Sequence, residues 1–288
     1  MLELLNESLR VELLHPNEDH ARFGVRYCTG GYIFQVHDAR HGPLLTGPTY
    51  PESFNWFDGQ GIPDAFNLGP VLSATTPGHA LVLGTGLCDL AARKVLAFAH
   101  WDIETAPGVL VFTTGQAFEG TEVALRRTVS LDGRTIRSRT ELTNKGGTFV
   151  PVRWFPHPFY PQLAAAPNTA AGQASAREAD AASDELLWIN TPLRWREGDA
   201  YSLRDNGWIA RRGWPWQEGK YLPLEHDAHA PLVLLQRHPS LGLVAAATSY
   251  VPAHFPIWGN AHTFSWEPFL ERLLAPGITL DWWIDYQF

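Results

Sequence analysis

Apolar and polar side chains alternate along the middle of the chain with a period of two residues. Between residues 121 and 132 the apolar positions are Val123, Leu125, Val129 and Leu131, with mostly polar residues between them. Asp132-Gly133 is typical of a two-residue hairpin turn, and the return segment 134–143 carries Ile136 and Leu142 on one face. Because successive side chains of a strand point to opposite faces, this stretch predicts a β-hairpin.

The same period recurs at the end of the chain, where Leu280, Trp282, Ile284, Tyr286 and Phe288 alternate with Asp281, Trp283, Asp285 and Gln287. Shorter strands are predicted at Leu9–Leu14, Phe23–Tyr27, Tyr32–His37, Leu232–Leu235 and Leu243–Ala247. Helical periodicity is almost absent, and turn signals recur about every ten residues. The pattern predicts an all-β protein, either a sandwich or a closed β structure.

No linker or internal repeat divides the chain, so residues 1–288 are expected to form one domain. Residues 38–70 are rich in glycine, proline and aromatic residues, which predicts an ordered surface segment that carries function or covers a sheet edge. The alanine-rich polar segment 162–183 predicts a loop insertion.

The charge of the chain argues against nucleic-acid and membrane partners. The formal net charge is -8, whereas both partners select clustered lysine and arginine. We interpret the arginines at 126–127, 137, 139 and 211–212 as parts of solvated strand faces or turns. Neither a signal peptide nor a long apolar span is visible, so a cytoplasmic location is expected, with a monomeric or homodimeric state.

The residues that usually hold metals or nucleotides do not form convincing motifs. Cys28 and Cys88 lack a metal-ligand spacing, and the histidine pairs 37/41 and 226/229 have no clear third ligand. Glycine-rich stretches lack the strand–loop–helix context that cradles phosphate. We therefore expect no metal and no cofactor. The 12 tryptophans suit either the faces of sugar rings or the filling of a large core.

Two side chains stand out as candidates for acid–base chemistry. His157 ends a predicted strand that begins at Val150, and Pro156 and Pro158 bracket it at a position where prolines fit a strand end. Glu267 lies in an aromatic strand, with Phe264 and Trp266 on the opposite face, and apolar surroundings raise the pKa of a carboxyl group. The alternatives are a structural histidine and a glutamate that pairs with an arginine at a strand edge.

The order of several short motifs resembles the galactose mutarotase-like family, which includes aldose 1-epimerases and hexose-phosphate mutarotases. Gly30-Gly-Tyr-Ile is similar to an early G-G-x-I, and Trp154-Phe-Pro-His-Pro-Phe-Tyr160 to the family's H-P-Y-F or H-x-Y-F stretch. Phe264-Ser-Trp-Glu-Pro268 resembles C-x-E-P, and Leu274-Ala-Pro-Gly resembles the closing L-x-P-G-E turn. The resemblance spans most of the chain and is strong over roughly 121–161 and 254–288.

The resemblance implies a large antiparallel β-sandwich with a sugar in a cleft and no cofactor. In this family a histidine protonates the ring oxygen and a glutamate deprotonates the anomeric hydroxyl, roles that map to His157 and Glu267. Asp227 corresponds loosely to an aspartate that holds sugar hydroxyls. Arg153 and Trp266, beside the two candidates, are further substrate-binding candidates.

Two segments depart from the family pattern. Asp58-Gly-Gln-Gly-Ile-Pro63 lacks the arginine of R-G-G-I-P, and Thr85-Gly-Leu-Cys-Asp89 replaces H-G-x-x-R. Those basic residues bind substrate, and phosphate where it is present, so an unphosphorylated sugar is expected. His79 or His100 is a candidate replacement for the missing histidine.

Three hypotheses follow. The first is an aldose 1-epimerase-like enzyme, and it expects His157 and Glu267 to face each other across a cleft about one sugar ring wide. The second is a non-catalytic carbohydrate-binding or sensing protein with the same fold. The third is another sugar-modifying activity, such as a hydrolase or lyase domain.

Overall fold

The computed structural model describes residues 1–47, 59–163, 184–196, 198–216 and 218–288. Every strand pair that it records is antiparallel, and the 3₁₀ turn η1 (His20–Arg22) is the only helix among these residues. The all-β prediction is therefore confirmed, and the strands form the sheets of a large antiparallel sandwich. Most of the insertion predicted at 162–183 lies outside the described residues.

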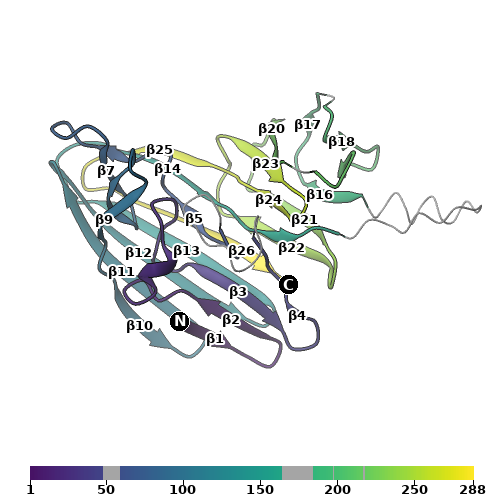
Figure 1. Ribbon diagram of the computed structural model, residues 1–288, viewed down its shortest axis with the longest axis horizontal. Coiled ribbons are helices and arrows are strands. Elements are labelled where there is room, and N and C mark those ends of the chain that lie inside the picture. Colours follow the sequence, from purple (N-terminus) through teal and green to yellow (C-terminus); the bar gives the residue numbers. More distant parts are fainter. Residues whose placement is uncertain (48–58, 164–183, 197, 217) are drawn as a thin grey trace, which may run out of the picture.

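The largest sheet forms one layer of the molecule, and its long strands β11, β12 and β13 run side by side in Figure 1. Its ten strands, in spatial order, are β10 (Asp102–Ala106), β11 (Val109–Phe118), β12 (Thr121–Asp132), β13 (Thr135–Asn144), β26 (Thr279–Gln287), β22 (Gly242–Thr248), β21 (Val233–His238), β16 (Glu185–Ile189), β19 (Ile209–Arg211) and β18 (Tyr201–Leu203).

Four smaller sheets complete the fold. Two of them come from the N-terminal part of the chain: β1 (Leu2–Leu5), β2 (Leu9–Leu13), β3 (Ile33–Asp38) and β4 (Gly42–Pro43) form one, and β6 (Val71–Leu72), β7 (His79–Val82), β8 (Gly86–Asp89) and β9 (Lys94–Phe98) form the other. The remaining two contain β25 (Leu270–Leu274), β14 (Val150–Pro156) and β5 (Asp64–Ala65), and β15 (Tyr160–Pro161), β24 (Thr263–Trp266), β23 (Phe255–Gly259), β20 (Lys220–His226) and β17 (Leu193–Arg194).

One core joins the large sheet to the smaller sheets. Its main cluster includes Leu125 and Ile136 of the large sheet together with Val11 of β2 and Val152 of β14. The rings of Trp154 and Trp282, which belong to β14 and β26, meet edge to face with centroids 5.3 Å apart. Burial of such large apolar side chains is the main favourable term in folding. Tryptophan thus fills the core at several positions, which is one of the two roles that the composition suggests for it.

The strongest period-two patterns form the centre of the large sheet. β12 and β13 pair as the predicted hairpin. β13 also pairs with β26, so the final strand of the chain lies in the middle of this sheet. Trp282, Ile284 and Tyr286 are buried, as their alternation predicts.

Three sequence interpretations are wrong. Arg211 of β19 is not part of a solvated face: it is buried, and its guanidinium donates to the carbonyl oxygen of Leu163 at 2.7 Å. Arg127 is not part of a solvated face: it is fully buried and pairs with Asp64 of β5, because it has the inward parity of Leu125 in β12. Residues 23–27 do not form a strand. Val25 and Tyr27 are buried, but the segment bends repeatedly and forms no ladder pairs.

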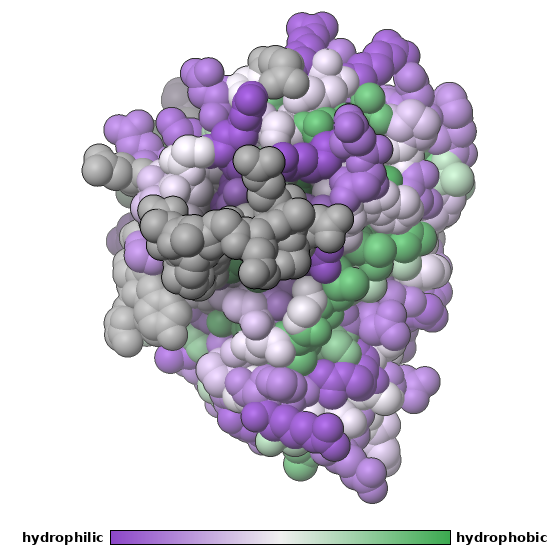
Figure 2. Space-filling model, turned by 90° about the vertical axis from the view of Figure 1, so that its right-hand side faces the viewer, coloured by the Kyte–Doolittle hydropathy of each residue, from purple (hydrophilic) through white to green (hydrophobic). Residues whose placement is uncertain are grey.

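One face of the molecule is mainly polar. In Figure 2 most of the face shown is hydrophilic, and hydrophobic residues form a narrow band across it. In the part of the chain that the structure describes, no helix is long and apolar enough to cross a membrane.

Candidate active site

The end of β14 places His157 in the interior of the molecule. Phe155 and Pro156 pair with Ala65 and Asp64 of β5, and β14 ends at Pro156, as the two prolines predict. The backbone N–H of His157 then donates to the carbonyl oxygen of Pro63 at 2.8 Å. The backbone on both sides of the histidine is therefore fixed by the segment 59–65.

This supporting segment approaches the site closely because two of its residues are glycines. A Cβ atom at Gly59 would lie 2.4 Å from Cε2 of Phe159, and one at Gly61 would lie 2.2 Å from the carbonyl oxygen of Phe34. Gly61 also has a φ of +84°, a region that side chains rarely adopt. Residues 59–63, which belong to the segment that departs from the family pattern, therefore still support the backbone of His157.

Glu267 follows β24, in which side chains alternate between two environments. Thr263, Ser265 and Glu267 share one parity, and the backbone N–H of Glu267 donates to the carbonyl oxygen of Pro256 at 2.9 Å. Trp266 has the other parity, and its Nε1 donates to Oε1 of Gln236 of the large sheet. The strand therefore presents polar groups to the site and an aromatic ring to the core.

The two candidate side chains are in direct contact. Nε2 of His157 lies 3.2 Å from Oε1 of Glu267, and both side chains are almost fully buried. Nδ1 of His157 lies 2.8 Å from Oγ of Ser265. The imidazole ring stacks on Phe159 with centroids 4.3 Å apart, so it is held on both edges and on one face.

Burial dominates the ionisation of this pair. It raises the pKa of Glu267 from 4.5 to about 7, although the charge of Arg26 lowers it. Burial also lowers the pKa of His157 well below its usual 6.5, and the charge of Arg26 acts in the same direction. Since a buried site favours the uncharged form of each group, the pair holds one shared proton at mildly acidic pH and titrates as a unit.

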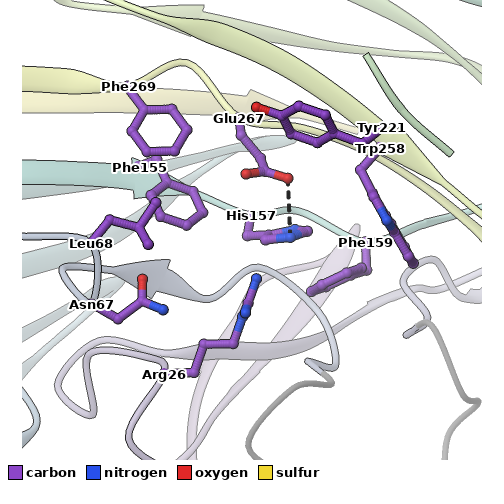
Figure 3. A pocket seen from close by; sticks show the side chains of 10 residues that line it. All are labelled: Arg26, Asn67, Leu68, Phe155, His157, Phe159, Tyr221, Trp258, Glu267 and Phe269. Atoms are coloured by element: carbon purple, nitrogen blue, oxygen red, sulfur yellow. Dashed lines mark ion pairs between the residues drawn. The ribbon is translucent and has the colours of Figure 1, made fainter. Parts of the chain in front are cut away.

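A cavity of about 370 Å³ opens onto this pair. Figure 3 shows Glu267 and Arg26 entering it from opposite sides, with His157 between them and aromatic rings around them. Its lining consists of Arg26, Asn67, Leu68, Phe155, His157, Phe159, Tyr221, Trp258, Glu267 and Phe269. Aromatic faces and a few convergent polar groups are the composition of a small polar-ligand site, such as a sugar site.

One polar atom in the lining is suited to a ligand. Oδ1 of Asn67 is buried and has no hydrogen-bond partner within the described residues. A buried carbonyl oxygen without a partner is costly, and a ligand hydroxyl in the cavity would satisfy it. Among the described residues, no group of three or more histidine, cysteine, aspartate and glutamate side chains could hold a metal ion.

Several solved structures share this architecture over nearly the whole length of both chains. The galactose mutarotase related enzyme from Lactobacillus acidophilus superposes with a TM-score of 0.61 at 12% identity, over 99% of this chain and 96% of that chain. A candidate aldose 1-epimerase from Escherichia coli K12 gives 0.57 at 13% identity, over 99% and 97%. A galactose mutarotase-like protein from Lactobacillus casei gives 0.54 at 13% identity, over 100% and 99%.

The chain has the galactose mutarotase-like fold. The sequence itself matches no family model and no curated protein. At identities of 10 to 13% the similarity shows the fold alone, and it confirms the fold that the sequence motifs imply.

On this mutarotase-like fold, the two catalytic candidates from the sequence lie together although they are far apart in the chain. They are closer than the expected width of one sugar ring. The expected cleft between the two side chains is therefore not observed, because Nε2 of His157 and Oε1 of Glu267 are in contact at 3.2 Å.

The other sequence candidates do not line the cavity. Arg153 forms an ion pair with Glu271 on the adjacent strand β25. Trp266 points into the core, since it has the parity opposite to Glu267. The guanidinium of Arg153 lies over the ring of Phe269, 5.2 Å from its centroid, but Arg153 is not itself a lining residue.

Asp227 and His79 lie in other surroundings. Asp227 pairs with Arg194 in a half-exposed ion pair at 2.5 Å. His79 pairs in register with Asp89 in the sheet of β7 and β8, and Thr85 of the same segment is buried and donates to the carbonyl oxygen of Tyr27. The segment that departs from H-G-x-x-R thus supports the backbone at Tyr27, the residue after Arg26 of the lining.

Sequence reasoning missed five polar or aromatic residues of the lining: Arg26, Asn67, Tyr221, Trp258 and Phe269. The alternation at 23–27 predicts a strand, whereas the segment bends and Figure 3 shows Arg26 pointing into the cavity. A signal was available for Trp258, which shares the aromatic stretch that leads to Glu267.

Proposed function

We propose that this protein is an aldose 1-epimerase-like enzyme that interconverts the anomers of an unphosphorylated sugar. The observation that carries the proposal is the contact of His157 and Glu267 on the wall of a cavity lined by aromatic rings. The similarity to structures described as mutarotase-like supports it at the level of the fold.

Ring opening requires an acid at the ring oxygen and a base at the anomeric hydroxyl. In the ionised state of the pair, Nε2 of His157 carries a proton and Glu267 is a carboxylate. The imidazolium gives its proton to the ring oxygen as the bond from that oxygen to the anomeric carbon breaks. The carboxylate takes the proton of the anomeric hydroxyl, and a carbonyl group forms.

Ring closure reverses these transfers after rotation about the bond next to the carbonyl carbon. The former ring hydroxyl attacks the carbonyl carbon and returns its proton to His157, while the Glu267 carboxyl group protonates the carbonyl oxygen. The cycle consumes no proton from solvent. A buried pair with one shared proton is suited to it, because the intermediate state, neutral imidazole with protonated carboxyl, is the one that burial favours.

The lining favours a small neutral sugar. Trp258, Phe159 and Phe269 offer apolar faces, whereas Asn67 and Arg26 offer groups for hydroxyls. Arg26 is the only basic side chain among the described lining residues apart from His157. A phosphate ester usually engages several cationic or backbone donors, so an unphosphorylated aldose is the better match.

The experiment is an anomer-exchange assay by NMR or polarimetry over common hexoses and pentoses. Wild-type protein is expected to accelerate exchange of at least one sugar, and His157→Ala and Glu267→Gln to lose at least about 100-fold of that rate. Asp285→Asn removes an exposed ion pair with Arg137 and serves as the matched control, with an unchanged rate.

Saturable sugar binding without any exchange would contradict the enzyme and favour the alternative, a non-catalytic carbohydrate-binding or sensing protein. Cleavage of an oligosaccharide would point instead to a hydrolase or lyase. The cytoplasmic location and the monomeric or homodimeric state stay predictions from the sequence.

A further inference from the structure

Ser265 contacts the edge of the His157 ring that lies away from Glu267. Its Oγ lies 2.8 Å from Nδ1, on the side of the imidazole opposite to Glu267, and Ser265 is fully buried. The parity of β24 brings Ser265 to this place, two residues before Glu267. One short strand and the residue just after it therefore supply partners for both nitrogens of the imidazole ring.

The two nitrogens of the histidine have different surroundings. Nε2 faces Glu267 at 3.2 Å in the wall of the cavity, whereas Nδ1 faces the serine hydroxyl. A hydroxyl group can accept a hydrogen bond from Nδ1–H or donate one to a bare Nδ1. The partner of one nitrogen decides which nitrogen carries the proton.

We propose that Ser265 is a positioning residue that accepts a hydrogen bond from Nδ1–H of His157 and so keeps Nε2 as the nitrogen that exchanges its proton. This inference rests on the proposed function. In an acid cycle the imidazolium loses only the proton on Nε2, and Nδ1–H stays bonded to the serine before and after the transfer. Without this bond the neutral ring can adopt the other tautomer, in which Nε2 already carries its proton and cannot take one back.

The chain contains a matched control two residues away. Thr263 is also fully buried, has the same parity in β24, and uses its hydroxyl to bond the carbonyl oxygen of Tyr160 at 2.8 Å. Thr263→Val therefore removes a buried hydroxyl and its hydrogen bond from the same strand without touching His157. Ser265→Ala removes the hydroxyl that faces the imidazole.

The test records nitrogen chemical shifts of the histidine rings in full-length protein with ¹⁵N-labelled histidine. The chain has 12 histidines, and the spectrum of His157→Gln assigns the signal of interest. In wild type the neutral His157 is expected to show a protonated Nδ1 and a bare Nε2. Ser265→Ala should shift this population towards the Nε2–H tautomer, and Thr263→Val should leave it unchanged.

Anomer exchange gives the second readout. Ser265→Ala is expected to lower kcat about tenfold, since one hydrogen bond of ordinary strength is lost, with KM changed less than about twofold. Ser265→Thr, which keeps a hydroxyl group, should restore most of the rate.

A wild-type spectrum with the proton on Nε2, or identical spectra for wild type and Ser265→Ala, would overturn the role of Ser265. Absence of exchange in wild type would overturn the proposed function, and the tautomer in the two spectra would then still decide about Ser265.

Discussion

Among the described residues, two pairs of a basic and an acidic side chain are buried on both sides, and they are joined through adjacent residues. Asp64 of β5 pairs with Arg127 in the core, and the preceding residue, Pro63, accepts the backbone hydrogen bond of His157, which pairs with Glu267. Both pairs are almost inaccessible to solvent. They differ in whether the cation can lose its proton and in whether a ligand can reach them.

The core pair holds a permanent charge. Arginine is not deprotonated in proteins, and burial raises the pKa of Asp64 while the guanidinium of Arg127 opposes that rise. Arg127 also donates to Oγ of Ser138 at 2.7 Å. Neither Asp64 nor Arg127 lines the cavity onto which the histidine opens. The core pair serves as a fixed connection between the large sheet and the segment that backs the histidine.

The cavity pair can exchange a proton. Histidine replaces arginine as the cation, the pKa of its carboxylate partner lies at about 7, and the wall of a cavity exposes both groups to a ligand. Under the proposed function, burial alone does not make a pair catalytic. A titratable partner and access to a ligand are also required.

The largest effect on stability is expected from breaking the core pair. Asp64→Asn leaves the charge of Arg127 buried without its counter-ion, which costs about 3–5 kcal/mol of unfolding free energy. Urea unfolding followed by tryptophan fluorescence measures it. Asp285→Asn, in the exposed pair with Arg137, should cost about 1 kcal/mol or less. Equal small losses for both variants would contradict a structural role for the core pair.

Removal of the acidic partner of the cavity pair should raise stability instead of lowering it, and the gain should depend on pH. Between the unfolded pKa of 4.5 and the folded pKa of about 7, Glu267 is protonated in the native state and ionised in the unfolded chain, so the contribution of Glu267 to stability falls as pH rises. His157, whose pKa is lowered by burial, contributes with the opposite sign below pH 6.5 and is present in both proteins of the comparison. Glu267→Gln removes this term. The variant should therefore gain stability relative to wild type across this window, by at most about 3 kcal/mol above pH 7.

Urea unfolding of wild type and Glu267→Gln at pH 5, 6, 7 and 8 tests this expectation. A difference between the two proteins that does not change with pH would show that the carboxyl group of Glu267 titrates normally.

The rate should also depend on the shared proton. The pair needs one proton to act as both acid and base, and it loses that proton as pH rises through the pKa of about 7. We expect kcat/KM to fall by about tenfold per pH unit on the alkaline side of that value. On the acidic side the decline should begin well below pH 6.5, because burial lowers the pKa of His157. A rate that still rises above pH 8 would contradict a shared proton.

The smallest expected effect concerns the support of the imidazole. A methyl group at Gly59 would press on Phe159, whose ring stacks on His157. Gly59→Ala should cost about 1–3 kcal/mol of stability through overpacking and lower the rate by displacing the histidine. Gly147→Ala, where a Cβ meets nothing within 4 Å, is the matched control. If the two substitutions changed the rate equally, the packing of Phe159 on His157 would not matter for the rate.

Much of the fold could be predicted from the sequence, because its strands carry a clear period of two. The hairpin at 121–144 and the final strand follow that pattern. Arg127 could also have been placed correctly, since it has the parity of the buried residues of β12. Its partner Asp64 lies 63 residues earlier, and no local pattern reveals such a pairing.

The candidate site was predictable only in part. His157 and Glu267 stood out through the prolines and aromatic residues beside them, and Ser265 shares the parity of Glu267 in its strand. Arg26 could not be placed, because residues 23–27 alternate like a strand but bend into the cavity. Asp227 is the opposite case: a loose motif match placed it in the site, but it forms an ion pair with Arg194 and does not line the cavity.

A double-mutant cycle on the anomer-exchange rate tests most directly whether His157 and Glu267 act as one unit. The rates of wild type, His157→Ala, Glu267→Gln and the double variant would be measured on the same sugar. Groups that act together are strongly non-additive, so the double variant should be about as slow as the slower single variant. Losses that multiply, or single variants as fast as wild type, would contradict a joint acid–base role for the pair.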